Sequence, residues 1–173
     1  MLFRSLALKV GQELGLEGVS LKRLELGALF HDIGKIGIPE TILSKPGPLT
    51  AEERGIVETH PELGEKIIAP IDRLEEVRPI VRHCHERYDG AGYPDRLSGE
   101  EIPIESRIIL VCDAYHAMTT DRPYRKRLSA EEALRRLREA AGTQFDPRVV
   151  DVCVRVLASR EADASPSALP IPH

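Results

Sequence analysis

Apolar residues recur at every third or fourth position through most of this chain, and that spacing predicts helices. The first helix is marked by Leu2, Leu6, Val10 and Leu14 and is broken near Gly15. Because the pattern is already under way at the first residues, we expect the chain to start inside a helix and further sequence to precede it. Other helices are predicted over residues 20–33, 50–61, 79–85, 105–119, 129–141 and 147–158.

Helix starts and stops support this division. Residues 50–53 and 129–132 both read as capping boxes, in which the first side chain accepts a hydrogen bond from a first-turn amide. Pro61 is expected to end or kink the helix that contains His60. No pair of segments alternates as strands do, so the predicted fold class is all-α. The segment 159–173 is rich in Ala, Ser and Pro, and we expect it to be disordered.

The composition is that of one domain of ordinary size. The chain has 173 residues, of which 42% are hydrophobic, enough to build a core. A net charge of −4 argues against nucleic acid as the main partner but is compatible with a small phosphorylated ligand. Three cysteines without a Cys-x-x-Cys pair favour a reducing cytoplasm over a disulfide framework. No apolar run has the length of a membrane span.

Histidines and carboxylates occur in four separate segments, each beside apolar sequence. These residues are His31 with Asp32, His60, His85 and Asp113. Neutral imidazoles combined with carboxylates that can bridge two ions suit iron, manganese or similar first-row metals. Such a centre is typical of a metal-dependent phosphohydrolase. The sequence therefore predicts a buried metal site.

His31, Asp32 and Lys35 are expected on one helix, where a spacing of three and four residues turns all three toward one cavity. We interpret Asp32 as a catalytic carboxylate that bridges two ions, with His31 on one of them. Lys35 is the second candidate catalytic residue, because an ammonium group there would neutralise phosphate oxygens or a leaving alkoxide.

Five motifs follow one another in the order HDIGK, KPGPLTAEE with His60 after it, HERYDGAGYP, VCDAYHAM and DRPYR. With these motifs the chain resembles the HD-GYP branch of the HD-domain phosphohydrolases, from about Arg4 to about Val156. The resemblance implies an HD-domain helical bundle with a buried metal centre over residues 1–158, lacking the family's first helix or part of it. It also implies two or three divalent metal ions, iron or manganese, and hydrolysis of the bacterial messenger cyclic di-GMP to pGpG or GMP.

Site residues are carried over from the resemblance by position. The metal ligands fall at His31, Asp32, His60, His85 and Asp113. Lys35 falls on the motif lysine that lies near the metals and the phosphate. Tyr93, Arg122 and Arg125 fall on positions that contact the nucleotide or shape its pocket. Guanidinium groups suit this role because they match phosphate oxygens in a fork geometry.

Three positions depart from the family pattern. The early histidine ligand has no counterpart, since no histidine precedes His31. Cys84 stands where the family has the first of two adjacent histidines, and it is either a tentative metal ligand or an inert buried residue. His116 replaces a second aspartate and lies three residues after Asp113, where it could orient that carboxylate.

Three functions are consistent with these features. The first is a cytoplasmic phosphodiesterase acting on cyclic di-GMP, which the otherwise intact ligand set favours. The second is an HD phosphohydrolase that acts on another nucleotide or phosphate ester. The third is a catalytically impaired regulatory or interaction module, docking for example on a diguanylate cyclase (GGDEF) domain. Cys84 and the absent early histidine favour this third function.

Overall fold

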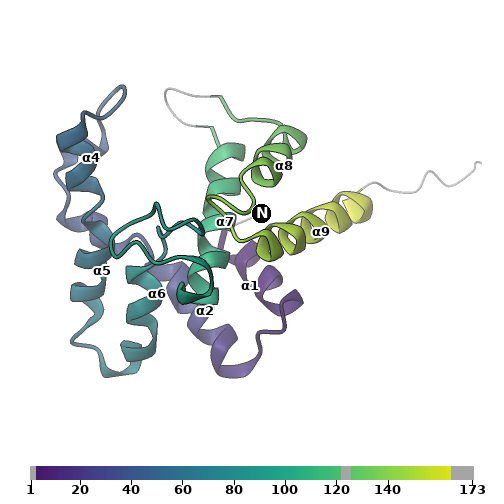
Figure 1. Ribbon diagram of the computed structural model, residues 1–173, viewed down its shortest axis with the longest axis horizontal. Helices are drawn as coiled ribbons and strands as arrows, with labels where there is room; N and C mark the ends of the chain where they lie inside the picture. The colour runs from purple at the N-terminus through teal and green to yellow at the C-terminus, as the bar shows by residue number, and fades with distance from the viewer. Residues whose placement is uncertain (1–2, 122–125, 165–173) are drawn as a thin grey trace, which may run out of the picture.

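The computed structural model describes residues 3–121 and 126–164 (Figure 1). In these residues the chain is helical and has no strand, which confirms the all-α prediction. The α-helices are α1 (Phe3–Glu13), α2 (Gly18–Phe30), α3 (Glu40–Leu43), α4 (Ala51–Val57), α5 (His60–Ile68), α6 (Arg78–Arg82), α7 (Ile104–Thr119), α8 (Ala130–Glu139) and α9 (Pro147–Ala164). The 3-10 helices are η1 (Ile33–Gly37), η2 (Asp72–Val77) and η3 (Gly99–Glu101).

Helix α7 is the centre of the fold. It packs against α1, α2, α8 and α9, and in Figure 1 it stands between α4–α6 on one side and α8 and α9 on the other. Ile108, Val111 and Cys112 of α7 are fully buried. Because neighbours cover this helix on several faces, its sequence is apolar over most of its circumference rather than along one stripe.

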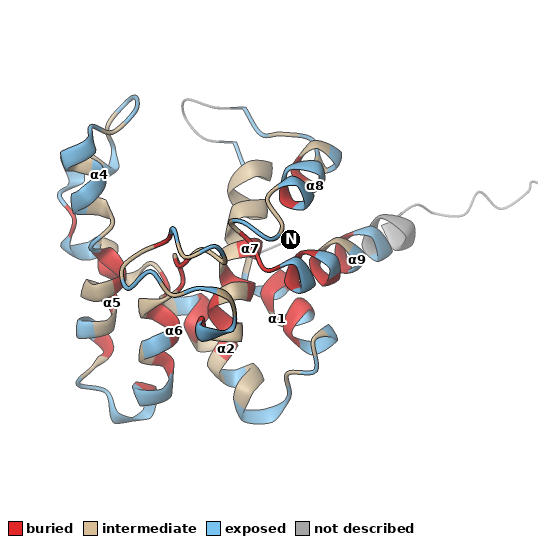
Figure 2. Ribbon diagram, in the orientation of Figure 1, coloured by how far each residue is buried: buried red, intermediate tan, exposed pale blue. Residues whose placement is uncertain are grey.

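A second, smaller apolar cluster fixes the arm formed by α5, η2 and α6. Its buried members are Ile68, Leu74, Val77 and Val81, and Leu26, Phe30 and Ile33 pack against them. The arm is thereby attached to the end of α2 and the start of η1. Helix α4 lies beyond the arm and has no buried residue; its ribbon in Figure 2 is pale blue and tan.

The chain leaves the predicted helices at three places, and each place carries a candidate site residue. Helix α2 ends at Phe30 rather than at residue 33, and Lys35 lies in η1, so the prediction that one helix carries both Asp32 and Lys35 was wrong. Helix α4 ends at Val57, and His60 begins α5 instead of continuing the earlier helix. Helix α6 ends at Arg82, so His85 lies in a turn.

The last helix is longer than its predicted range. We predicted an end near Ala158 and a disordered segment from residue 159, but α9 continues to Ala164. Residues 159–164 contain neither Gly nor Pro, and Pro166 is the first residue that opposes a helix. The rest of that segment lies outside the described residues. None of the helices in the described ranges is long and apolar enough to cross a membrane.

Candidate metal centre

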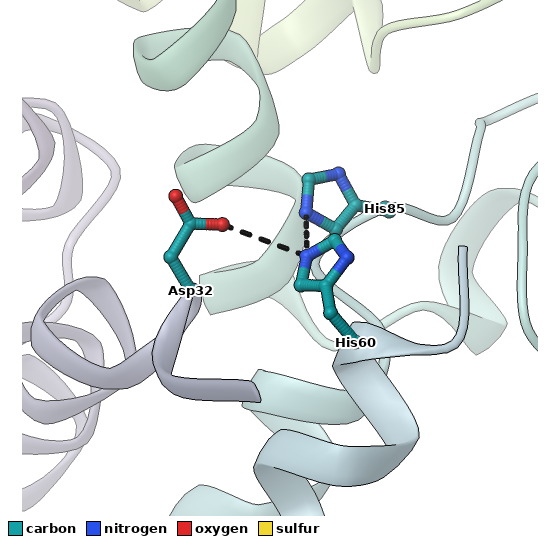
Figure 3. Close-up of side chains that lie close together, drawn as sticks. All are labelled: Asp32, His60 and His85. Atoms are coloured by element: carbon teal, nitrogen blue, oxygen red, sulfur yellow. Dashed lines mark hydrogen bonds and ion pairs between the residues drawn. The ribbon is translucent and has the colours of Figure 1, made fainter. Parts of the chain in front are cut away.

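Three side chains from separate parts of the chain meet at one point. Asp32 follows α2, His60 begins α5, and His85 follows α6; their ligand atoms all lie within 4.8 Å of one another (Figure 3). His60 Nε2 is 3.0 Å from His85 Nε2 and 3.5 Å from Asp32 Oδ1. Two imidazole nitrogens and a carboxylate oxygen are a donor set that divalent first-row metals accept.

The break between α4 and α5 orients His60. Pro61 has no N–H, so it cannot donate to the carbonyl oxygen of Val57 four residues earlier. That oxygen instead accepts a hydrogen bond from His60 Nδ1 at 2.7 Å. Because a carbonyl only accepts, Nδ1 carries the proton, and in the neutral ring Nε2 turns its lone pair toward Asp32 and His85.

His31 is oriented in the same way at the end of α2. Its Nδ1 donates to the carbonyl oxygen of Ala28 at 3.0 Å, one of the acceptors that a helix end leaves without a backbone partner. Its Nε2 then lies 3.6 Å from Asp32 Oδ2. A metal-binding histidine usually donates the N–H that faces away from the metal to a backbone carbonyl or a carboxylate. This hydrogen bond fixes the tautomer and leaves the other ring nitrogen free to bind the metal.

The Asp32 carboxylate is surrounded by positive and polar groups. Lys35 Nζ donates to Oδ2 at 2.7 Å, whereas Oδ1 is buried and has no hydrogen-bond partner. Burial by itself raises the pKa of Asp32, but the interactions with His60, His31 and Lys35 outweigh it and hold the pKa well below its ordinary value. An ionised carboxylate with a buried, unpartnered oxygen fits a site built for a cation.

His85 is neutral at physiological pH. Burial and then the proximity of His60 lower its pKa to about 3. Its ring stacks on Tyr93, with the centroids 5.3 Å apart and the planes 9° from parallel. Tyr93 N also donates to the carbonyl oxygen of His85 at 3.3 Å. The loop that contains Tyr93 therefore covers one face of His85.

Gly34 permits the close approach that brings Asp32 to His60. A Cβ at Gly34 would lie 1.8 Å from the carbonyl oxygen of His60 and 2.5 Å from the backbone nitrogen of Gly64. Both contacts are with backbone, which cannot rotate away. Only glycine lets η1 rest directly on the first turn of α5, and this contact sets the distance between the two ligand-bearing segments.

A second group beside the centre was not foreseen from the sequence. Arg82 donates to both carboxylate oxygens of Asp95 at 2.6 and 2.8 Å and to Glu65 at 2.8 Å. His83 Nε2 also contacts Asp95 at 2.9 Å, and Asp95 N donates to the buried Glu86 at 2.7 Å. This network, which we call the Arg82 clasp, ties the loop after Tyr93 to α5 and α6. The charged residues flanking HERYDGAGYP were its only sequence signal.

Cys84 and Asp113 are not part of the group that Asp32, His60 and His85 form. The Cys84 thiol is buried and donates to the carbonyl oxygen of Val81 at 3.1 Å, and it is not among the metal-ligand groups of the described residues. Burial, followed by the charges of Asp32 and Asp113, raises the pKa of this thiol. The tentative ligand role of Cys84 therefore has no geometric support. Asp113 is partly buried on α7 and close enough to Cys84 for this effect.

Two predicted arginines cannot be placed relative to the centre, whereas one aromatic residue that was not predicted lies beside it. Arg122 and Arg125 lie outside the described residues. Phe3 of α1, which the sequence did not single out, packs on His31 with ring centroids 4.9 Å apart, and its centroid is 6.4 Å from that of His116. An aromatic ring of α1 thus closes one side of His31.

Known proteins resemble this chain in both sequence and fold. A family model described as HD domain matches residues 1–149. The cyclic di-GMP phosphodiesterase response regulator RpfG of Xanthomonas campestris is 41% identical over 88% of this chain and 41% of its own length. The 3′3′-cGAMP-specific phosphodiesterase 2 of Vibrio cholerae is 37% identical over 71% of this chain and 24% of its own length.

A solved structure shows the same fold. Bd1817, an HDG"Y"P protein from Bdellovibrio bacteriovorus, superposes with a TM-score of 0.72 and 19% identity over 90% of this chain and 50% of its own. The chain spans about two fifths of the length of curated relatives such as RpfG. The extent of the family match decides the assignment: the chain belongs to the HD domain family, and its ordered motifs are those of the HD-GYP branch.

Proposed function

We propose that this chain is a metal-dependent phosphodiesterase that hydrolyses cyclic di-GMP to pGpG or GMP. The observation that carries the proposal is the convergence of Asp32, His60 and His85, with an unpartnered carboxylate oxygen and a histidine lone pair facing the same point. The names of the relatives supply the substrate class, since RpfG acts on cyclic di-GMP.

The donor set of Asp32, His60 and His85 fits a divalent cation, and we propose two or three such ions, iron or manganese. Asp32, His60 and His85 would hold them, with His31 and Asp113 as further ligands. When bound, such cations act as Lewis acids toward a phosphate and lower the pKa of water to give hydroxide. We assign no ligand role to Cys84, because its thiol is committed to the Val81 carbonyl.

The chain's own groups would orient the substrate around that centre. Lys35 lies beside Asp32 and is only half-buried, so its ammonium can turn from the carboxylate to a phosphate oxygen. It would stabilise the charge that develops there during displacement. Tyr93 shields His85 from water on one side. Arg122 and Arg125 are proposed to bind the second phosphate.

A second candidate substrate is 3′3′-cyclic GMP-AMP, because another relative is named for it. Cytoplasmic location is proposed from the three free cysteines. A diguanylate cyclase domain stays the proposed interaction partner.

Anaerobic incubation of the Fe(II)- or Mn(II)-loaded chain with cyclic di-GMP, followed by chromatography, tests the proposal. We expect metal-dependent formation of pGpG or GMP that is lost in Asp32→Ala and kept in Asp72→Ala, an exposed aspartate on η2. Absence of product from the metal-loaded chain, with intact metal content, would favour a regulatory module instead. Product from cyclic GMP-AMP alone would select the second substrate.

A further inference from the structure

A cavity of about 530 Å³ opens beside the metal centre. Glu58 lines it on one side, and residues 90–94 with Arg96 line it on the other. Both walls are attached to metal-centre residues, because Glu58 precedes His60 by two residues and Tyr93 stacks on His85. A nucleobase lies one sugar away from its phosphate, so a nucleotide whose phosphate is at the centre has this cavity within reach.

Two opposite charges face this cavity without being used elsewhere. In the part of the chain that the structure describes, neither Glu58 nor Arg96 makes an ion pair or a side-chain hydrogen bond. By contrast, Arg82 and Arg87 on the same side of the molecule are each paired with a carboxylate. The unpaired Glu58 carboxylate and Arg96 guanidinium are therefore available to a ligand that carries hydrogen-bond donors at one end and acceptors at the other.

Arg96 also has an unusual backbone conformation. Its φ is +58°, and it is the only residue other than glycine with a positive φ among the described residues. Such a conformation is uncommon for a residue with a side chain, and residues held in it cluster at active sites and ligand-binding positions. Here it places a long cationic residue on the rim of the cavity rather than the glycine that the backbone would prefer.

We propose that this cavity binds a guanine base of the cyclic dinucleotide, with Glu58 and Arg96 as the specificity-determining residues. Guanine presents the N1–H and N2–H donors side by side, which a carboxylate can accept together. Its O6 and N7 are acceptors, which suit a guanidinium group. Adenine has an acceptor at N1 and lacks the amino group at C2, so it would leave the Glu58 carboxylate without a partner. This inference rests on the proposed function.

Tyr93 supplies the aromatic surface that a base requires. One face of its ring lies against His85, and Tyr93 is also one of the residues that line the cavity. Stacking on an aromatic ring is tolerant of base identity, so Tyr93 would hold the base while Glu58 and Arg96 select it. Guanine is also the base shared by the two substrates named for the relatives, cyclic di-GMP and 3′3′-cyclic GMP-AMP.

The test compares three phosphodiesters on the Mn(II)-loaded full chain: cyclic di-GMP, cyclic di-AMP and bis(p-nitrophenyl) phosphate, which has no base. The variants are Glu58→Gln and Arg96→Gly, because glycine accepts the positive φ. Glu40→Gln, an exposed glutamate outside the cavity, is the control. We expect kcat/KM for cyclic di-GMP to fall about 10- to 100-fold in Glu58→Gln, the size of one paired base contact. Hydrolysis of bis(p-nitrophenyl) phosphate should follow the Glu40→Gln control.

Binding of GMP and AMP to the same proteins is a second readout that does not need turnover. The wild type should prefer GMP, and Glu58→Gln should lose that preference. Equal losses on all three phosphodiesters, or no loss on any, would overturn the inference, as would a wild type that binds both mononucleotides alike. If the wild type cleaves bis(p-nitrophenyl) phosphate but no cyclic dinucleotide, the proposed function fails, and the GMP preference alone decides the guanine site.

Discussion

Replacing Gly34 by alanine adds one methyl group at the contact that holds the metal centre together. The new Cβ would start 1.8 Å from the His60 carbonyl oxygen, and real Cβ atoms essentially never come closer than 3.0 Å to another heavy atom. Segment η1 and helix α5 must therefore separate by about 1.2 Å, the difference between those distances. Because the opposing atoms are backbone, we expect the free energy of unfolding to fall by about 3 kcal/mol, the upper part of the usual range for overpacking.

The same movement would separate the ligands. Asp32 precedes Gly34 by two residues, and its Oδ1 is only 3.5 Å from His60 Nε2. A displacement of about 1 Å at a catalytic constellation can cost about 10²-fold in rate. Gly34→Ala should therefore bind Mn(II) more weakly and hydrolyse cyclic di-GMP about 10²-fold more slowly than the wild type.

Urea denaturation with EDTA present measures the stability without a contribution from metal, and Mn(II) titration and product formation follow on the same preparations. Gly55→Ala is the matched control, because nothing lies within 4 Å of the added Cβ. Gly55 is inside α4, so alanine there should raise stability by about 0.5–1 kcal/mol. A Gly34→Ala protein as stable and as active as Gly55→Ala would refute the proposed contact between η1 and α5.

Three further predictions concern the surroundings of the centre. Arg82→Ala should lower the free energy of unfolding, measured by urea denaturation, by about 1.5–3 kcal/mol, which is the usual contribution of hydrogen bonds to charged groups. The loss should exceed that in Arg135→Ala, because Arg135 lies on an exposed helix face. Equal losses would contradict a stabilising role for the clasp. Hydrogen bonds from Arg82 and then His83 lower the pKa of Asp95 from 3.8 to about 2, so its ionised form stabilises the fold above about pH 4. The stability difference between wild type and Asp95→Asn should shrink as pH falls from 4 to 2, and a constant difference would contradict this. All three cysteines are free and buried, so Ellman's reagent should label none in the native protein and three after denaturation; rapid, metal-sensitive labelling of Cys84 would restore its role as a ligand.

The helical fold could be predicted because its signals are local. The apolar sequence over residues 105–119 predicted a helix, and α7 spans Ile104–Thr119. The Thr50 capping box forms as predicted, with the Thr50 side chain accepting from Glu53 N and the Glu53 carboxylate accepting from Thr50 N. Only half of the capping box predicted at residues 129–132 forms: the Ser129 side chain accepts from Glu132 N, while the Glu132 carboxylate pairs with Arg135 and Arg136. The capping contacts span three residues, and the sequence specifies them directly.

The helix breaks at the centre were harder to place. We expected the helix to break at Pro61, but the break falls at residues 58–59. A helical residue donates its N–H to the carbonyl four residues earlier, so the missing N–H of Pro61 removes the hydrogen bond to Val57 and the helix ends there. The break before Lys35 had local signals in Gly34 and Gly37, and the predicted helix already stopped at residue 33. The packing of Gly34 on α5, a contact between segments about 30 residues apart in the chain, had none.

The identity of the candidate ligands came from motif order, and their arrangement came from the fold. The Arg82 clasp joins Glu65, Arg82 and Asp95 across 30 residues, so no local pattern could reveal it. Cys84 shows the same limit. Its position in the motif left both a ligand and an inert role open, and the burial of its thiol against the Val81 carbonyl, which supports the inert role, was visible only in the fold.

Bound metal and hydrolysis measured on the same samples would test most directly whether Asp32, His60 and His85 form a catalytic metal centre. Mn(II) binding followed by electron paramagnetic resonance, together with cyclic di-GMP turnover, should be lost in parallel in Asp32→Asn. Asp72→Asn, an isosteric change at an exposed position, should keep both. If Asp32→Asn binds as much Mn(II) and forms product as fast as Asp72→Asn, these three residues are not the metal centre of this protein.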